Sequence, residues 1–165
     1  KLLACEHEGA KPDVVTLGKA LSGGMYPVSA VLSSREVLGV FEPGDHGSTF
    51  GGNPLACAVA REAVKVIVDE ELCQRSTELG EYLMSRLQAI ESSHVRLYRG
   101  KGLFVGIVLK PEAGGARRFC EALEERGVLA KDTHGNVIRL APPLVVTQEE
   151  LDWMVDRLED VLTTA

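Results

Sequence analysis

The stretch DVVTLGKALSGGMYPVSA, residues 13–30, constrains the fold more than any other part of this sequence. Its apolar run Val14–Leu17 is typical of a buried strand and stops at Gly18. Lys19 follows directly and precedes a turn-forming Ser-Gly-Gly that we expect to be flexible. A second strand, rich in β-branched residues, is predicted over residues 28–32. The pattern therefore places Lys19 at the end of one of two neighbouring strands.

Lys19 is a candidate catalytic residue because of this position. In α/β folds the end of a strand fixes the backbone, while the loop that follows leaves room for a ligand. A lysine held among apolar neighbours loses the hydration of its charged form, and the neutral amine is the nucleophile that forms Schiff bases with carbonyls. Most lysines at such positions are ordinary surface residues. The other motifs must decide between these interpretations.

The segment HGSTFGGNPL, residues 46–55, is the second informative stretch. Asn53 suits a helix N-cap, and Pro54 suits the first helical position, where its missing N–H costs nothing. Ser48, Thr49 and three glycines lie just upstream. Small residues and hydroxyls beside a helix N-terminus suit an anion such as a phosphate. A plain glycine-rich connection fits the composition equally well.

Apolar spacing predicts an α/β chain in two parts. A short helical turn capped by Ser34 is expected over residues 34–38, after a loop over residues 1–12. The acidic cluster at residues 69–71 predicts a domain boundary after residue 70, which gives parts 1–70 and 71–165. The second part is expected to form a small mixed sheet covered by helices on one side. Helices are predicted over residues 54–69, 71–91, 116–126 and from a Thr147–Glu150 capping box onward, and strands over residues 95–99, 103–109, 128–131 and 137–140. The residues expected on the inward faces of the four helices are, in order, Leu55, Val59, Ala63 and Val66 or Ile67; Leu72, Leu79, Leu83, Leu87 and Ile90; Phe119 and Leu123; and Leu151, Val155, Leu158 and Leu162.

Arg139 is an unusual residue in the second part because it interrupts the apolar run VIRLAPPL. We expect a buried or half-buried guanidinium that faces a cleft. Burying it without an anion would be costly, so a carboxylate partner is required. Planar bidentate pairing suits the α-carboxylate of an amino acid, but a structural salt bridge fits equally well. Lys101, between two glycines, is expected to be an ordinary turn residue.

Composition excludes several classes of partner. The net charge is −6 and the 18 basic residues are dispersed, so nucleic acid and membrane are not expected as partners. No apolar run approaches the roughly 20 residues of a membrane helix. The four cysteines lie far apart without a CxxC pair, which favours a reducing, cytoplasmic location. No metal site is expected, because Cys5 and His7 are more typical of an ordinary loop.

Four stretches together carry a family resemblance. In order they are TLGKALSGGMYPVSAVL, HGSTFGGNPLACAVA, RGKGL and THGNVIRLAPPL. They closely resemble the second half of the ornithine aminotransferases, which are class-III pyridoxal-phosphate-dependent aminotransferases, and the resemblance covers nearly all of the chain. It implies the C-terminal half of a fold-type I transferase. Residues 1–70 would be the last strands of the large-domain sheet with their helices, and residues 71–165 the small α/β C-terminal domain.

The resemblance also implies roles for individual residues. Pyridoxal 5'-phosphate would be the cofactor and Lys19 its Schiff-base lysine. Ser48 and Thr49 would bind the cofactor, with Thr49 reaching the phosphate of the other subunit of a homodimer with shared active sites. Arg139 would bind the dicarboxylate substrate. The implied reaction moves the δ-amino group of L-ornithine to 2-oxoglutarate and gives glutamate 5-semialdehyde and glutamate.

Other interpretations remain compatible with these residues. A sister class-III enzyme could act on acetylornithine or another ω-amine, although the residues of the stretches GMYPVSAVL and THGNVIRLAPPL favour ornithine. A non-catalytic small-molecule-binding remnant and a purely structural dimerisation piece are further alternatives. The chain is expected to be inactive alone, because the family's aspartate beneath the pyridine ring and its ring-contact residues lie outside it.

Overall fold

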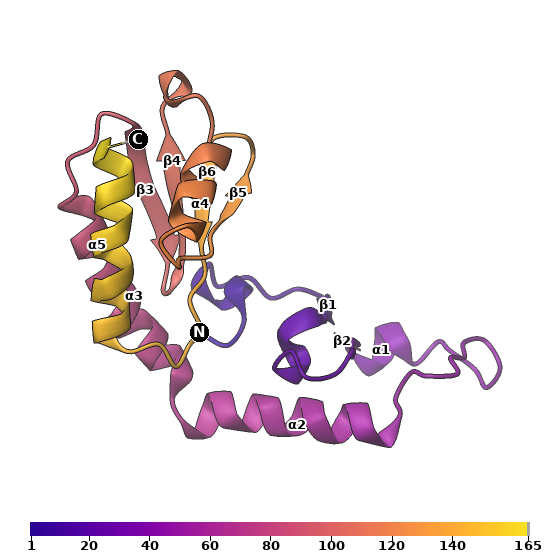
Figure 1. Ribbon diagram of the computed structural model, residues 1–165. Helices are drawn as coiled ribbons and strands as arrows, with labels where there is room; N and C mark the ends of the chain where they lie inside the picture. The colour runs from indigo at the N-terminus through magenta and orange to yellow at the C-terminus, as the bar shows by residue number, and fades with distance from the viewer. Residues whose placement is uncertain (165) are drawn as a thin grey trace. The chain divides into compact units, whose positions relative to one another are not determined.

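The computed structural model describes residues 1–164, which divide into two compact units (Figure 1). Unit 1 is Lys1–Cys73, and unit 2 is the remainder from Gln74 on. Helix α3 (Leu72–Gln88) starts just before this division and contributes nearly all of its length to unit 2. The boundary expected after residue 70 lies immediately upstream of this helix.

Unit 1 is built on a short β-hairpin and one long helix. Strand β1 (Val14–Leu17) pairs antiparallel with β2 (Ala30–Ser33), so that Leu17 lies opposite Ala30. The two predicted strands are thus neighbours, although β2 begins two residues later than expected. The remaining elements are the 3-10 helices η1 (Ala4–His7), in a segment expected to be loop, and η2 (Lys19–Ser22), and the α-helices α1 (Arg35–Leu38) and α2 (Pro54–Asp69).

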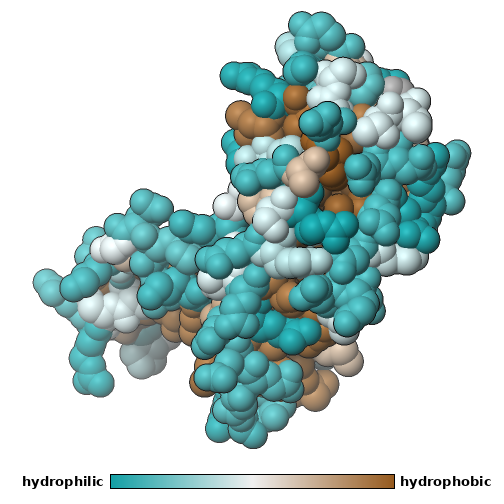
Figure 2. Space-filling model, turned by 90° about the vertical axis from the view of Figure 1, so that its left-hand side faces the viewer, coloured by the Kyte–Doolittle hydropathy of each residue, from teal (hydrophilic) through white to brown (hydrophobic). Residues whose placement is uncertain are grey.

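Most apolar side chains of unit 1 are not buried. Strand β1 was expected to be buried, but its residues alternate between exposed and half-buried. In α2 the predicted inward face includes Leu55 and Val66, which are 58% and 37% exposed, and Ala56 is the buried residue. A two-stranded hairpin and a single helix provide too few layers to bury an apolar stripe. Apolar side chains consequently reach the surface between hydrophilic ones (Figure 2).

Unit 2 contains a four-stranded sheet of order β3-β4-β6-β5. All three strand pairs are antiparallel, so the expected mixed sheet is wrong. The reason is local, because β5 and β6 are joined by a tight turn through His134 and Gly135, both with positive φ, rather than by a crossover. The strands are β3 (Val95–Lys101), β4 (Phe104–Leu109), β5 (Lys131–Thr133) and β6 (Val137–Leu140).

The start of β5 also differs from the prediction. A strand was expected over residues 128–131, but Val128 is buried at the end of helix α4 (Arg117–Glu124), where its N–H donates to the carbonyl of Leu123 at 2.9 Å. Gly127 has a φ of 82°, the left-handed geometry expected for the residue that ends the α4 region. The chain therefore uses Val128 to close a helix, and β5 begins at Lys131.

Three helices cover one face of this sheet. Alternate residues of β4, Val105, Ile107 and Leu109, are buried against them, while Phe104 on the opposite face is 61% exposed. The remaining elements are the 3-10 helix η3 (Pro111–Ala113) and α5 (Gln148–Thr164). The predicted inward faces of the helices are confirmed for Leu83 and Leu87 of α3, Phe119 and Leu123 of α4, and Leu151, Val155, Leu158 and Leu162 of α5.

Gly80 allows the β3–β4 turn to pack directly on α3. A Cβ atom at Gly80 would lie 2.3 Å from the carbonyl carbon of Gly102, in the middle of the turn. Ser76, one helical turn earlier, accepts the N–H of Leu103 at 3.3 Å. Backbone contact at this point leaves no room for a side chain on the helix. The same contact explains Gly102 of RGKGL, because a Cβ atom there would lie 2.5 Å from Ser76 Oγ.

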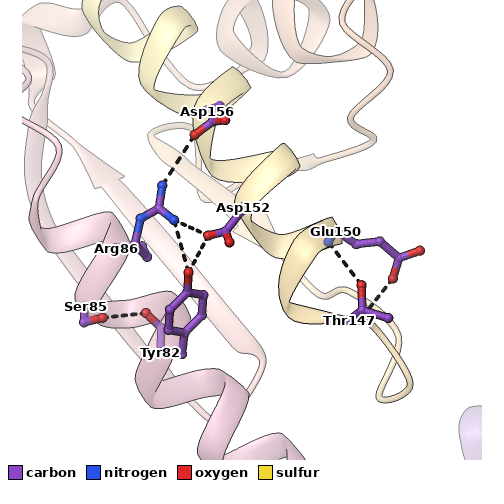
Figure 3. A network of polar contacts seen from close by, with 7 residues as sticks. All are labelled: Tyr82, Ser85, Arg86, Thr147, Glu150, Asp152 and Asp156. Atoms are coloured by element: carbon purple, nitrogen blue, oxygen red, sulfur yellow. Dashed lines mark hydrogen bonds and ion pairs between the residues drawn. The ribbon is translucent and has the colours of Figure 1, made fainter.

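A polar network joins α3 to α5 on the surface of the core (Figure 3). The hydroxyl of Tyr82 donates to Asp152, and Arg86 pairs with Asp152 and, at 3.4 Å, with Asp156. The pKa of Arg86 is raised, first by its hydrogen bond with Tyr82 and then by the nearby carboxylates. These contacts fix the register of the two helices.

The capping box predicted at the start of α5 is confirmed (Figure 3). The N–H of Glu150 donates to Thr147 Oγ1 at 3.2 Å, and the N–H of Thr147 donates to Glu150 Oε2 at 2.8 Å. Two helix-terminal donors are thereby satisfied reciprocally. Within residues 1–164, no helix is long and apolar enough to cross a membrane.

Two tyrosines of unit 2 should respond differently to loss of the hydroxyl. Tyr82→Phe should lower the free energy of unfolding by about 1 kcal/mol, because it removes the hydrogen bond to Asp152. Tyr98→Phe should leave it unchanged or raise it, because the Tyr98 hydroxyl is buried without a hydrogen-bond partner among residues 1–164. Chemical denaturation of both variants measures the difference, and equal losses would contradict this account.

Tyr98 should also contribute to alkaline unfolding. Burial, and secondarily the charge of Glu159, raises its pKa above the usual value near 10. The folded chain then keeps the phenolic proton to higher pH than the unfolded chain, so this contribution is complete below about pH 10 and is lost as the pH rises through the folded pKa. In denaturation curves across this window, Tyr98→Phe should lose less stability than the wild type. An unchanged pH slope would contradict the assignment.

Candidate active site

Lys19 is the first residue of η2 and lies two residues after the end of β1. It is therefore at the end of a strand, as predicted. Its backbone is left-handed, with a φ of 50°, a conformation that is uncommon for any residue with a Cβ atom. Hydrogen bonds hold this turn: the N–H of Leu21 donates to Gly18 at 3.1 Å, and that of Gly23 to Ala20 at 2.9 Å. The Lys19 side chain therefore leaves the hairpin in a fixed direction.

Ser22 stabilises the turn that follows Lys19. Its side chain is buried, only 1% exposed, and its hydroxyl donates to the carbonyl of Tyr26 and accepts the N–H of Tyr26 at 3.2 Å. The Ser-Gly-Gly segment, expected to be flexible, is therefore closed by side-chain hydrogen bonds. A serine before two glycines is typical of an exposed turn. The sequence therefore did not indicate that the Ser22 side chain bonds the backbone of Tyr26.

The Lys19 side chain lines a cleft of about 480 Å³ in unit 1. The walls come from the start of η2, the segment before β2, the glycine-rich loop, and the first turn of α2. Lys19 itself is exposed, which corrects the expectation that apolar neighbours enclose it. The hairpin and one helix supply only part of an enclosure, and Phe50 at the rim is 82% exposed. The other lining residues are Pro27, Val28, Ser29, Gly51, Gly52, Asn53 and Ala56.

The glycine-rich loop ends at the N-terminus of α2, as predicted. Asn53 Oδ1 accepts the N–H of Ala56 at 2.9 Å, and its side-chain amide donates to the carbonyl of Phe50 at 2.8 Å. The hydroxyl oxygen of Ser48 accepts the N–H of Gly51 at 2.9 Å, so Ser48 holds the loop in its conformation. Pro54 has no N–H and the Ala56 N–H is taken by Asn53, so the attraction of this helix start for an anion comes from the dipole of the 16-residue helix.

The structure brings some of the predicted site residues together and not others. Lys19 shares its cleft with residues 50–53. Ser48, which is bonded to Gly51, and Thr49 are both exposed, and neither lines the cleft. The donor set, an amine beside a glycine loop and a helix N-terminus, fits an aldehyde that carries a phosphate. None of the lining residues has a carboxylate that could face a pyridine nitrogen.

Arg139 lies in unit 2, on the open face of the sheet. Its neighbours Ile138 and Leu140 are fully buried, and strand alternation directs Arg139 to the opposite face. The expectation of a buried or half-buried guanidinium is wrong, because Arg139 is exposed, although Val137 on the same face of β6 is buried. It does line a cleft, of about 440 Å³, with Arg99 and Lys101. Within residues 1–164 no carboxylate forms an ion pair with it.

The sequence pattern of a known family extends over this whole arrangement. The family described as "Aminotransferase class-III" matches residues 1–162, which include both clefts. This chain belongs to the class-III aminotransferases. Curated relatives in this family are ornithine aminotransferases, and the resemblance seen in the four sequence stretches is confirmed.

Two relatives illustrate the extent of the match. The ornithine aminotransferase of Bordetella pertussis is 57% identical over 160 residues, which is 97% of this chain and 39% of the relative. That of Bacillus subtilis is 51% identical over 165 residues, which is 100% of this chain and 40% of the relative. The chain therefore spans about 40% of the length of these class-III aminotransferases.

Solved class-III structures share the fold. An ornithine δ-aminotransferase of Plasmodium falciparum superimposes with a TM-score of 0.91 at 43% identity, over 98% of this chain and 43% of that one. An acetylornithine aminotransferase from Elizabethkingia anophelis superimposes with a TM-score of 0.91 at 51% identity, over 98% of this chain and 43% of that one. The predicted fold class, an α/β portion of a pyridoxal-phosphate-dependent transferase, is confirmed.

Metal ligands do not gather in the described part of this class-III chain. Among residues 1–164, no group of three or more His, Cys, Asp and Glu side chains could hold a metal ion. Cys5 and His7 lie in the short helix η1. Lys101 ends β3 beside Gly102, as expected of a turn residue, and it also lines the Arg139 cleft. Arg99 lines the same cleft, although its sequence context did not mark it as a site residue. The strand register brings Arg99 and Arg139 to opposite sides of Gly106.

Proposed function

We propose that this chain carries the cofactor lysine of an ornithine aminotransferase. The enzyme would move the δ-amino group of L-ornithine to 2-oxoglutarate, which gives glutamate 5-semialdehyde and glutamate. The observation that carries the proposal is that the Lys19 amine lines the same cleft as residues 50–53 at the N-terminus of α2. The names of the curated relatives support the choice of substrates.

Lys19 would hold pyridoxal 5'-phosphate through a covalent bond from its Nζ to the aldehyde carbon. When bound, this cofactor supplies an electron sink that makes a proton on the substrate carbon next to the amine removable. Once the substrate amine had replaced it, the freed Lys19 amine would be the general base that accepts this proton and later returns it. One side chain would thus serve for binding and for proton transfer.

The glycine-rich loop would hold the phosphate. The positive end of the α2 dipole attracts the anion, and the Ser48 hydroxyl fixes the loop through Gly51 while its own proton remains available to donate. Thr49 is exposed, so it is free to reach the phosphate of a second subunit, the role that the family resemblance implies for it. We therefore propose a homodimer with shared active sites. We also propose a cytoplasmic location, which the dispersed cysteines favour.

Arg139 would bind a carboxylate of 2-oxoglutarate. A guanidinium offers two parallel N–H donors to a carboxylate, and its exposure on the open face of the sheet allows a free ligand to reach it. The chain alone would not turn over substrate. Lys19 is exposed here, and no lining residue of its cleft supplies a carboxylate for the cofactor ring.

The second candidate is transfer of the amino group of acetylornithine or another ω-amine. A specific observation favours it, since the acetylornithine aminotransferase of Elizabethkingia anophelis is 51% identical, as similar as several ornithine enzymes. The two candidates differ in the amino donor and share every role assigned above. Comparing kcat/KM for ornithine and acetylornithine in the enzyme that contains this chain decides between them.

Lys19 should be the site of covalent cofactor capture. The chain is incubated with pyridoxal 5'-phosphate and reduced with borohydride, and peptide mapping by mass spectrometry should place the label on Lys19. Lys19→Ala should abolish this label and the associated absorbance. The matched control is Lys65→Ala, which removes an exposed lysine of α2 that pairs with Glu62 and should leave the label unchanged. Equal labelling of the Lys19→Ala chain would contradict the proposal.

Ser48 should matter for the phosphate and not for the aldehyde. Ser48→Ala removes the acceptor for the Gly51 N–H and should weaken binding of pyridoxal 5'-phosphate about tenfold, the usual effect of losing one hydrogen bond that supports an anion site. Pyridoxal, which lacks the phosphate, should bind both chains equally. Isothermal titration with the two ligands measures this. A parallel loss for pyridoxal would show that the substitution disturbs the whole cleft.

A further inference from the structure

We propose that Arg99 is a second carboxylate-binding residue, which holds the same carboxylate as Arg139 across Gly106. This inference rests on the proposed function in one respect, because that function gives Arg139 its ligand. It adds a residue whose role the four family stretches do not specify. The inference concerns the cleft on the open face of the unit 2 sheet, which we call the arginine cleft. Its lining residues are Arg99, Gly100, Lys101, Phe104, Val105, Gly106, Thr133, His134 and Arg139.

Strand register places the two arginines in one row. Arg99 of β3 lies opposite Gly106 of β4, and Gly106 lies opposite Arg139 of β6. Residues directly opposite each other in a sheet point to the same face. Neighbouring strands are about 4.8 Å apart, so the backbones of Arg99 and Arg139 are about 10 Å apart with one glycine between them. Two long side chains that start at this separation can reach a single carboxylate.

The Arg99 side chain lies over the glycine. A Cβ atom at Gly106 would be 3.7 Å from both Cγ and Nε of Arg99, and 3.3 Å from Cγ1 of Val137 on β6. Arg99 therefore extends along the row from β3 toward β6, which is the strand that carries Arg139. Glycine at this place keeps the path between the two guanidinium groups open.

The charge of the arginine cleft is opposite to that of the chain. The whole sequence has 24 acidic and 18 basic residues, yet this cleft gathers Arg99, Lys101 and Arg139 and no acidic side chain. Within residues 1–164, none of these three cations forms an ion pair with a carboxylate. Like charges placed side by side repel, and an anion between them removes the repulsion. The cleft is thus complementary to a carboxylate.

Lys131 is the other cation beside Arg139, and it differs from Arg99. It lies opposite Arg139 on β5, but its ammonium group donates to Asp132 at 2.7 Å, and this contact is the main cause of the lowered pKa of Asp132. Lys131 is therefore neutralised by its own neighbour. Arg99 retains its donors for a ligand, and the ligand class that we assign is a free small carboxylate of the 2-oxoglutarate type.

The test is a titration of the full chain with glutarate, followed by the backbone amide signals of Gly106 and Arg139 in two-dimensional NMR. The wild type should show saturable shifts. Arg99→Gln and Arg139→Gln should each weaken binding about tenfold, as expected when one charge-assisted hydrogen-bonding group is lost. The double variant should be weakened much less than the product of the two single effects, because both arginines act on one carboxylate. Multiplying effects would overturn the proposal.

Three controls sharpen this result. Arg96→Gln removes the same charge from the same strand outside the cleft, and its affinity should stay within about twofold of the wild type. Gly106→Ala keeps every charge but places a methyl group in the path, and it should lose affinity. The neutral analogue glutaramide should not bind. Equal losses in Arg96→Gln and Arg99→Gln would show a general charge effect and would refute a specific role for Arg99.

The same titration separates other sources of the carboxylate. If the Gly106 signal moves with chain concentration and glutarate does not reverse the shift, the anion comes from a second protein chain, and the proposal of a free ligand is wrong. The experiment needs no cofactor. Loss of the Lys19 label with intact glutarate binding would therefore refute the proposed function alone, whereas normal labelling without any effect of Arg99→Gln would refute only this inference.

Discussion

The left-handed backbone of Lys19 is the constraint on which the rest of unit 1 depends. This conformation costs about 1–2 kcal/mol for a residue with a Cβ atom. The surrounding structure holds it through the extended Gly18, the bonds of η2 and the two hydrogen bonds between Ser22 and Tyr26. Backbone strain of this kind is concentrated at functional sites, where it orients a reacting group. The strain and the candidate chemistry coincide at the same lysine.

The two units solve different physical problems. Unit 2 buries one face of its sheet under α3, α4 and α5, so its open face is a rigid platform for exposed cations. Unit 1 has a single buried position in its long helix and leaves its cleft only partly walled. The amine and the anion-binding loop lie on the thin unit, and the arginines lie on the well-packed one. Each unit thus contributes one kind of group to the proposed reaction.

Local sequence signals predicted the fold well wherever the structure depends on neighbours along the chain. The Asn53–Pro54 helix start, the Thr147–Glu150 box and the inward stripes of α3 and α5 follow from nearest-neighbour hydrogen bonds and helical spacing. Short apolar runs were less informative. The run at residues 128–131 did not show that Val128 closes α4 through Leu123, or that a tight turn at His134 and Gly135 pairs β5 antiparallel with β6.

The candidate site was predicted in its chemistry more than in its environment. Sequence placed Lys19 at the end of a strand and Asn53 at the start of α2, and the structure puts both on one cleft. It did not predict that Lys19 and Arg139 are exposed, because burial depends on layers that a pattern of residues cannot count. Arg99 became a candidate only through the register of three strands.

A strained backbone holds Lys19 in place for the proposed chemistry. The most direct measurement is the free energy of unfolding of Lys19→Gly beside that of Lys19→Ala, by chemical denaturation of the chain. Glycine adopts a left-handed φ without a steric penalty, so Lys19→Gly should be more stable than Lys19→Ala by about 1 kcal/mol, although glycine is ordinarily the less stabilising residue. If Lys19→Ala is as stable as Lys19→Gly or more stable, the strain at this position is absent and the account fails.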